Sequence, residues 1–147
     1  MNKKKVAIGC DHAGFPYKAA IIRHLEDAGY ELLDFGTNSI DSVDYPDHVH
    51  PLAASIENGN AAAGILLCGS GNGVAITANK HKQIRAALVW RDDIAALARQ
   101  HNDANVICLP ARFISQNEAI HFTDVFLHTE FEGGRHKQRV DKIADHC

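Results

Sequence analysis

The sequence predicts an α/β fold, a three-layer sandwich in which a five-stranded parallel sheet carries helices on both faces. Short apolar runs rich in β-branched residues alternate with longer amphipathic segments, and this alternation occurs five times along the 147 residues. Successive parallel strands need a long crossover connection, which is usually a helix. By analogy with other five-stranded doubly wound sheets, we expect the strand order 2-1-3-4-5.

Each expected strand is a short apolar run followed by residues that favour a loop. The first contains Val6, Ala7 and Ile8 and is closed by the loop GCDHAG. The five runs cover residues 6–8, 31–35, 64–68, 85–90 and 105–109.

The segments between these strands repeat apolar residues at helical spacing. In the first segment Ile21, Ile22, Leu25 and Ala28 share one face, and Gly29 ends the helix. Proline is typical of the first helical turn, so Pro46 marks the start of the second helix. We expect helices over residues 15–28, 46–58, 73–81, 92–100 and 116–127, and a C-terminal amphipathic helix over residues 134–145.

Composition and charge limit the class of protein. The chain has no linker, repeat or low-complexity tract, which predicts a single domain over residues 1–147. A formal charge of −3 argues against nucleic acid or an acidic membrane as a partner, and no apolar run is long enough for a membrane helix. The first apolar run is also too short for a signal peptide. The four cysteines form no C-x-x-C pair, which favours reduced thiols in the cytoplasm.

Three loops follow strands at the carboxyl edge of the expected sheet, where ligands bind in open α/β folds. They contain the sequences GCDHAG, CGSGNG and LPARF. We therefore expect five side chains to share this edge, namely Asp11, His12, Cys68, Ser70 and Arg112.

The loop CGSGNG places Cys68 directly before three glycines in five residues. It lacks the spacing of a dinucleotide fingerprint and the G-K-[ST] end of a P-loop. Successive backbone amides here favour an anion cradle, and the start of the next helix favours the thiolate of Cys68 as a base or nucleophile. The alternative is a tight turn beside a buried, inert cysteine.

The C-terminal segment gives a second anion signal. Arg135 and Arg139 lie four residues apart and share a helical face, while Val140 and Ile143 lie on the other side. Two guanidinium groups on one face suit a phosphate dianion. Paired arginines on a solvated helix are also common, so this pattern alone leaves both interpretations open.

The segment RQHNDANV places His101 and Asn102 between the fourth helix and the fifth strand, at the amino edge of the sheet. A catalytic His101 would therefore serve the site of a neighbouring chain. The alternative is a histidine that caps carbonyls at a helix C-terminus. We expect no metal site, because His48 and His50 are two residues apart and no H-x-x-x-H or thiol pair accompanies them.

Six motifs taken together resemble the ribose-5-phosphate isomerase B family, which also includes galactose-6-phosphate and allose-6-phosphate isomerases. The motifs are GCDHAGF, DYPD, CGSGNG, ANK, RQHNDANV and EGGRHKQRV, and they run from the first strand to the last helix. The resemblance implies a Rossmann-like α/β sandwich that forms homodimers and sometimes tetramers. It also implies isomerisation of a phosphosugar through a cis-enediolate, with no cofactor.

The resemblance assigns a role to each matching residue. Cys68 would move the proton between C2 and C1, and Asp11 would handle hydroxyl protons. His101, assisted by Asn102, would open the furanose ring in a site at the subunit interface. The enediolate would be held by the segment Gly69, Ser70, Gly71, Asn72 and Gly73, the sugar would contact Tyr45, and the phosphate would be bound by His12, Arg112, Arg135 and Arg139.

Two features refine the resemblance. One branch of the family lacks the cysteine and carries a glutamate directly after GSGNG, whereas this chain has Cys68 and, at that position, Val74. The complete set of phosphate and ring-opening residues in one chain favours ribose 5-phosphate over a hexose 6-phosphate such as allose or galactose 6-phosphate. A non-catalytic phosphosugar sensor is the alternative of another class, but a sensor has no need of Cys68, Asp11 and His101.

Overall fold

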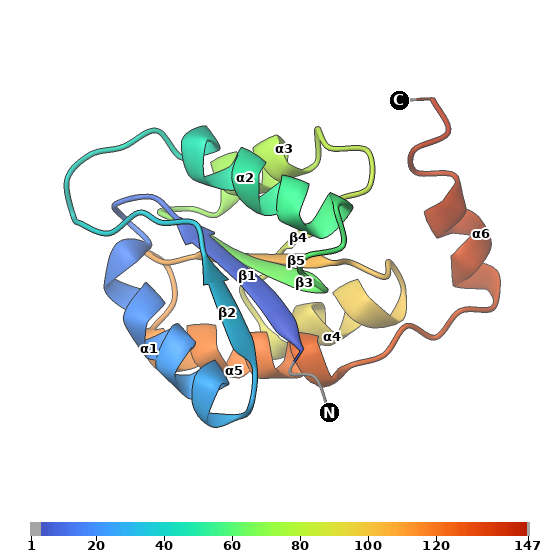
Figure 1. The fold of residues 1–147 in the computed structure, drawn as a ribbon. Coiled ribbons are helices and arrows are strands. Elements are labelled where there is room, and N and C mark those ends of the chain that lie inside the picture. Colours follow the sequence, from blue (N-terminus) through green and yellow to red (C-terminus); the bar gives the residue numbers. More distant parts are fainter. Residues whose placement is uncertain (1–3, 147) are drawn as a thin grey trace.

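The computed structural model describes residues 4–146 and contains a twisted five-stranded sheet between two layers of helices (Figure 1). Every pair of neighbouring strands is parallel. The strands are β1 (Lys5–Cys10), β2 (Glu31–Asp34), β3 (Ala63–Cys68), β4 (Ala86–Leu88) and β5 (Val106–Pro110). The predicted fold class is therefore confirmed.

The predicted strand order is wrong at one edge of the sheet. The order is β2-β1-β3-β5-β4, so β5 and β4 exchange the places that we expected for them. All five residues of β5 are buried, and Val106 pairs with Gly64 on one side and Ala86 on the other. The three residues of β4 are only half-buried. A longer, fully apolar strand is stabilised at the centre of a sheet, and a short, partly exposed one is tolerated at the edge.

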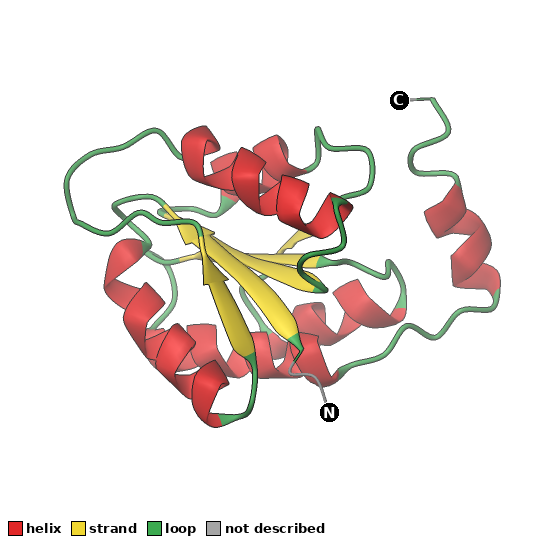
Figure 2. Ribbon diagram, in the orientation of Figure 1, coloured by secondary structure: helices red, strands yellow, loops and turns green. Residues whose placement is uncertain are grey.

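The helices follow the predicted ranges within a few residues at each end (Figure 2). Pro46 is the first residue of its helix, as expected. The six helices of the described chain are α1 (Phe15–Asp27), α2 (Pro46–Glu57), α3 (Asn72–Ala78), α4 (Asp92–Gln100), α5 (Gln116–His128) and α6 (Arg135–Asp141). None of these helices is both long enough and apolar enough to cross a membrane.

Alternate residues of the central strands pack against different helix layers. Val6 and Ile8 of β1 join the core beneath α1, α4 and α5, whereas Ala7 joins the core beneath α2 and α3. Cys68 and Cys108 belong to the second of these cores. The side chain of Cys68 therefore leaves the sheet on the α2–α3 side, at the carboxyl end of β3.

Helix α6 stands apart from the layers, as Figure 1 shows. None of its residues is buried, although such a short helix gains most of its stability from packing. The chain reaches it through Gly133 and Gly134, whose φ angles of +67° and +55° favour glycine and turn the connector outwards. Its exposed face remains open to another molecule.

Candidate active site

A cavity of about 460 Å³ opens at the carboxyl edge of the sheet, where the sequence places its anion-binding loops. Seven of its eight lining residues were predicted for a site, and the loops after β1, β3 and β5 contribute most of them. Tyr45 reaches the cavity from the start of α2. The lining residues are Asp11, Tyr45, Cys68, Gly69, Ser70, Gly73, Arg112 and Phe113.

Cys68 lies where a buried strand meets this cavity. Its residue is only 4% exposed, and the amide of Gly71 donates a hydrogen bond to Sγ over 3.2 Å. A donor aimed at sulfur stabilises the thiolate more than the thiol. The Cys68 side chain thus combines shelter from water with a donor for its anionic form.

Two other thiols of the described chain differ from Cys68 in their surroundings. Cys10, Cys68 and Cys108 form no disulfide with one another, while Cys147 lies outside the described residues. Burial raises the pKa of Cys10 to about 11 and also raises the pKa of Cys108, which Cys68 raises further. Both groups therefore stay protonated near neutral pH, as expected of core residues.

Two glycines of the CGSGNG loop are required for different structural reasons. Gly71 has φ +76°, and a Cβ atom there would lie 2.4 Å from Cδ1 of Leu88. Gly73 has an ordinary φ, but a Cβ atom would lie 2.5 Å from Cζ of Tyr45. Gly71 therefore allows the turn that aims its amide at Cys68, and Gly73 lets the Tyr45 ring approach the loop backbone.

The loop after β1 is folded around a carboxylate. Asp11 is 7% exposed, and its Oδ1 accepts hydrogen bonds from the amides of Ala13 at 2.9 Å and Gly14 at 3.2 Å. These bonds fix the carboxylate at the cavity wall. His12 does not line the cavity; its Nδ1 accepts a hydrogen bond from the amide of Val43 at 3.2 Å and ties this loop to the segment that leads to Tyr45.

Arg112 supplies positive charge to the cavity. Its amide donates to the carbonyl of Gly69 over 3.0 Å, so the loops after β3 and β5 are joined directly. A Cβ atom on Gly69 would lie 3.2 Å from one guanidinium nitrogen, which places the Arg112 side chain over the glycine loop. Within residues 4–146 this guanidinium has no acidic partner within ion-pair distance.

The cavity wall also includes Phe113, which the sequence analysis missed. This side chain is 76% exposed although it is large and apolar. Its place next to Arg112 in a loop at the carboxyl edge was the available signal. An exposed phenyl ring beside a polar cavity suits contact with a second molecule.

The structure separates four predicted site residues from this cavity. His101 ends α4, and Asn102 lies beside the amino end of β5, at the edge of the sheet opposite Cys68. Arg135 and Arg139 are exposed on α6. One chain therefore brings Cys68, Asp11 and Arg112 together but leaves His101 and the α6 arginines elsewhere.

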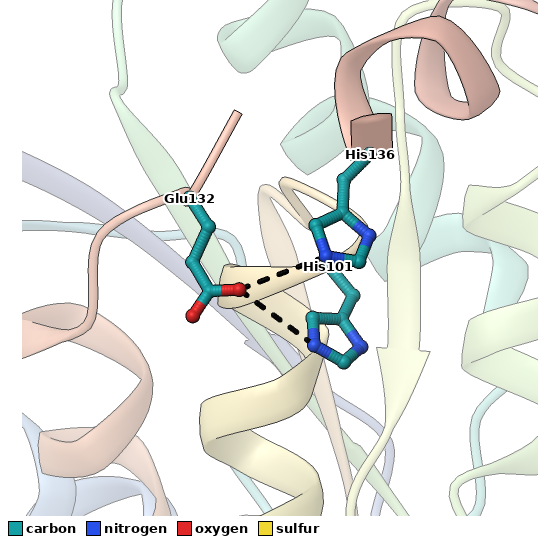
Figure 3. Close-up of side chains that lie close together, drawn as sticks. All are labelled: His101, Glu132 and His136. Atoms are coloured by element: carbon teal, nitrogen blue, oxygen red, sulfur yellow. Dashed lines mark ion pairs between the residues drawn. The ribbon is translucent and has the colours of Figure 1, made fainter. Parts of the chain in front are cut away.

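His101 has neighbours that the sequence analysis did not predict. Its ring stacks on His136 with centroids 4.2 Å apart, and Glu132 lies beside both rings (Figure 3). Oε1 of Glu132 is 3.8 Å from Nε2 of His101 and 3.6 Å from Nε2 of His136. Among the described residues, these three side chains have possible metal-ligand atoms that are close enough to bind one ion. The four-residue spacing of Glu132 and His136 was the available signal.

A larger cavity of about 570 Å³ lies at the amino edge, but both of its arginines are already paired with a carboxylate. Arg99 and Arg85 both pair with the carboxylate of Asp103, at 2.9 and 3.4 Å. A phosphate there would compete with an existing carboxylate, whereas Arg112 at the Cys68 cavity has no such competitor. The smaller cavity is therefore the better candidate for an anionic substrate.

Comparison with known proteins adds independent findings. Residues 6–143 match the family model described as Ribose/Galactose Isomerase. The probable ribose-5-phosphate isomerase B of Mycoplasma pneumoniae is 47% identical over 139 residues, covering 94% of this chain and 91% of the relative. Ribose-5-phosphate isomerase B of Escherichia coli is 43% identical over 141 residues, covering 96% and 95%.

Solved structures agree with this match over almost the whole chain. A ribose 5-phosphate isomerase of Thermotoga maritima superposes with a TM-score of 0.95 at 46% identity and covers 98% of this chain and 99% of that one. Ribose-5-phosphate isomerase B of Mycoplasma genitalium, solved with bound ribulose-5-phosphate, gives a TM-score of 0.93 at 43% identity, with 99% and 97% covered.

Proposed function

The chain belongs to the ribose/galactose isomerase family, as its motifs predicted, and we propose that it interconverts ribose 5-phosphate and ribulose 5-phosphate. The observation that carries the proposal is the sheltered Cys68 sulfur with the Gly71 amide donating to it, in a cavity that also holds Asp11 and Arg112. A base, a proton carrier and an anion partner are the groups that an aldose–ketose isomerisation needs.

Proton transfer is the work of Cys68 and Asp11. The Cys68 thiolate removes the proton from C2 of the open-chain aldose, and the electron pair of that C–H bond forms the C1–C2 double bond of a cis-enediolate. The same thiol then delivers the proton to C1. Asp11 carries the hydroxyl proton from O2 to O1, so the atoms balance without an oxidant, a reductant or a cofactor.

Stabilising the negative charge of the enediolate requires more free energy than the proton transfer itself. Loss of one well-placed oxyanion donor typically slows a reaction by about 10²-fold or more. The amides of the segment 69–73 and the hydroxyl of Ser70 hold the enediolate oxygens in this proposal, and Asn72 completes the loop. Tyr45 packs on Gly73 and forms the wall along the sugar.

Ring opening and part of the phosphate site come from a second copy of the chain. His101 and Asn102 lie at the opposite edge from Cys68, so a homodimer that joins unlike edges supplies both to one cavity. Arg135 and Arg139 on α6 would reach the neighbour's phosphate together with Arg112 and His12, and His12 also holds its own loop to Val43. The active site then lies at the subunit interface, in a dimer or a pair of dimers.

The same residues bear on the cellular compartment, the domain organisation and the partners of the enzyme. A catalytic thiol needs a reducing compartment, which supports the cytoplasm as its location. We also infer that residues 1–147 form one domain, because the sheet and both helix layers belong to one continuous segment that the family model spans from 6 to 143. Neither nucleic acid nor a membrane is needed as a partner.

An activity assay on purified protein tests the proposal. Incubation with ribose 5-phosphate, without added metal or nucleotide, should yield ketose, and allose 6-phosphate should react more slowly. Loss of a general base lowers turnover by about 10²- to 10⁴-fold, which is the expected effect of Cys68→Ala. The matched control is Cys108→Ala, since Cys108 is also a buried thiol, lies on the neighbouring strand and is outside the cavity.

Two results would contradict the proposal. Undiminished turnover by Cys68→Ala would remove the thiol from the mechanism. Tight binding of the sugar phosphate without any ketose would indicate a phosphosugar sensor instead.

The role of His101 has a separate readout. Ribulose 5-phosphate has no free C5 hydroxyl to close a furanose ring, so it enters the reaction in the open-chain form. His101→Asn should therefore slow the reaction from ribose 5-phosphate more than the reaction from ribulose 5-phosphate. Equal losses in both directions would exclude a ring-opening role.

A further inference from the structure

Three side chains at the amino edge form a group with the composition of a zinc site. His101 ends α4, Glu132 lies in the connector to α6, and His136 is in the first turn of α6 (Figure 3). Their ligand atoms all lie within 4.8 Å of one another. Two imidazoles and one carboxylate are a common protein ligand set for Zn²⁺, with the fourth position open.

The three groups do not satisfy one another. The distances of 3.8 and 3.6 Å from the Glu132 oxygen to the two imidazole nitrogens exceed the length of a hydrogen bond. Ligands bonded at about 2.1 Å to a tetrahedral ion lie roughly 3.4 Å apart, whereas neighbouring ligands of an octahedral ion lie roughly 3.0 Å apart. Both observed distances are longer than either value, so the side chains must move slightly to bind one ion, and the two imidazole ligands favour Zn²⁺ or Co²⁺ over Mg²⁺, which prefers oxygen ligands.

One backbone hydrogen bond and the packing of the two imidazole rings hold this group together. The amide of Glu132 donates to the carbonyl of Gln100 over 3.1 Å, which ties the connector to the residue before His101. The side chain of His136 is only 12% exposed. The backbone of Glu132 and the ring of His136 are therefore both held close to His101.

One adjustment is needed for all three ligands to bind one ion. The two imidazole planes lie 13° apart and are stacked, so their in-plane lone pairs run side by side. A single ion can lie in both ring planes only after one ring rotates. Binding should therefore disrupt the stack, and the partly exposed His101 ring has the freedom to turn.

We propose that His101, Glu132 and His136 form an inhibitory binding site for a tetrahedral transition-metal dication, with Zn²⁺ as the fitting ion. An occupied site holds the His101 imidazole on the metal and so removes it from ring opening. The inhibitory effect rests on the proposed function of His101, whereas binding rests on the geometry of the three side chains alone. The metal is an inhibitor here and has no part in the isomerisation.

Direct binding tests the site without reference to activity. Zn²⁺ is titrated calorimetrically into the full chain carrying Cys68→Ala, which removes a competing thiol. One ion should bind per chain, and Glu132→Gln or His136→Gln should each weaken the affinity by at least 10-fold, through loss of a ligand. His50→Gln is the matched control, because His50 also lies beside another histidine, but its Nδ1 is hydrogen-bonded to Nε2 of His81 at 2.7 Å, too close for two ligands of one ion.

A spectroscopic probe distinguishes the histidine group from a thiol. Co²⁺ bound to the chain with Cys68 intact should give tetrahedral d–d bands without a sulfur-to-metal charge-transfer band. Unchanged affinity in Glu132→Gln and His136→Gln, or a charge-transfer band that Cys68→Ala removes, would overturn the proposal.

Kinetics tests the inhibitory effect. Zn²⁺ should slow the reaction from ribose 5-phosphate more than that from ribulose 5-phosphate, and a chelator should reverse this. The inhibition should weaken at least 10-fold in His136→Gln, measured against that variant's own metal-free rate. Binding without inhibition would refute the inhibitory site. If His101→Asn showed equal losses in both directions, the ring-opening role would fail while the binding result still stood.

Discussion

Cys68 and Cys108 show how much a residue's neighbours decide its chemistry. Both thiols lie in the same core layer, on adjacent strands. Cys108 is fully buried, which raises its pKa, whereas Cys68 meets the Gly71 amide and a cavity. The glycines that follow Cys68 in the sequence made this distinction predictable. The sequence did not predict that the Gly71 amide points at the sulfur, because this depends on the φ angle of Gly71.

Gly73→Ala should impair catalysis more than folding. The added Cβ atom would lie 2.5 Å from Cζ of Tyr45, so the ring must move away from the loop. Tyr45 is 38% exposed and has room to swing, so we expect little change in thermal stability. Misplacement of a sugar-contacting wall should lower kcat/KM by about 10-fold or more, measured by steady-state kinetics.

A double-mutant cycle identifies the cause of that loss. If the clash with Tyr45 is responsible, Gly73→Ala should cost less in a Tyr45→Ala background. Equal losses with and without the ring would point instead to the backbone of the loop.

Cys10 gives the molecule a defined sensitivity to alkaline pH. Burial raises its pKa from 9.0 to about 11, so between these values the unfolded chain ionises the thiol while the folded chain keeps the proton. The stabilisation is complete below pH 9 and is lost as the pH rises through about 11. The expected contribution is roughly 3 kcal/mol of unfolding free energy. Urea unfolding across this range should show a shallower decline for Cys10→Ala than for the unchanged chain; parallel declines would be inconsistent with the buried thiol as the cause.

At the scale of elements, a buried lysine joins α1 to the loop after β2. Nζ of Lys18 contacts Asp34 at 2.9 Å, the carbonyl of Thr37 at 2.6 Å and Oδ1 of Asn38 at 2.7 Å. The lysine is 3% exposed. This anchor fixes the start of the segment that leads to Tyr45, and thus one wall of the cavity.

Lys18→Met should lower the free energy of unfolding by about 2–4 kcal/mol, because it removes the ammonium group from the Thr37 carbonyl and from the Asp34 carboxylate, which keeps only the Gly36 amide as a donor among the described residues. Water reaches Asp34, whose side chain is 36% exposed, and this keeps the loss below that of a fully buried pair. Urea unfolding measures the difference. Lys137→Met is the matched control: Lys137 pairs with Asp141 at 2.8 Å on the surface of α6, and exposed pairs contribute about 0.5 kcal/mol or less. Similar losses in both variants would rule out the anchor.

The sequence predicted where the strands and helices lie along the chain better than it predicted which of them are adjacent in space. Periodicity located the strands and helices because it depends on local spacing. Strand order depends on which strands the core buries on both faces, and the short half-buried β4 was placed too centrally. The loops at the carboxyl edge follow from topology, so Asp11, Cys68 and Arg112 were found. Phe113 and Glu132 were missed because their places depend on loop conformations between elements.

At the scale of the whole molecule, two edges of one sheet carry different parts of the proposed reaction. Cys68 lies at the carboxyl edge and His101 at the amino edge. The position of His101 already indicated a shared site in the sequence. How two chains associate depends on the exposed surfaces of both. Helix α6, which has no buried residues, offers such a surface.

Mixing two inactive variants tests the shared site. In a dimer of Cys68→Ala with His101→Ala, one site has both residues intact and the other has neither. Random re-association makes half of the dimers mixed, so about a quarter of the unmodified activity should return on unfolding and refolding the variants together. Mixed dimers that are verified by mass and remain inactive would contradict a site built from two chains.

The placement of Cys68 and His101 on opposite edges also means that the proposed shared site should depend on protein concentration. In the proposed shared site a single chain supplies only part of each active site, so the rate per chain should fall steeply once the protein is diluted below the concentration at which the two chains separate. A newly synthesised chain would then be inactive towards pentose phosphates until it associated with a second copy.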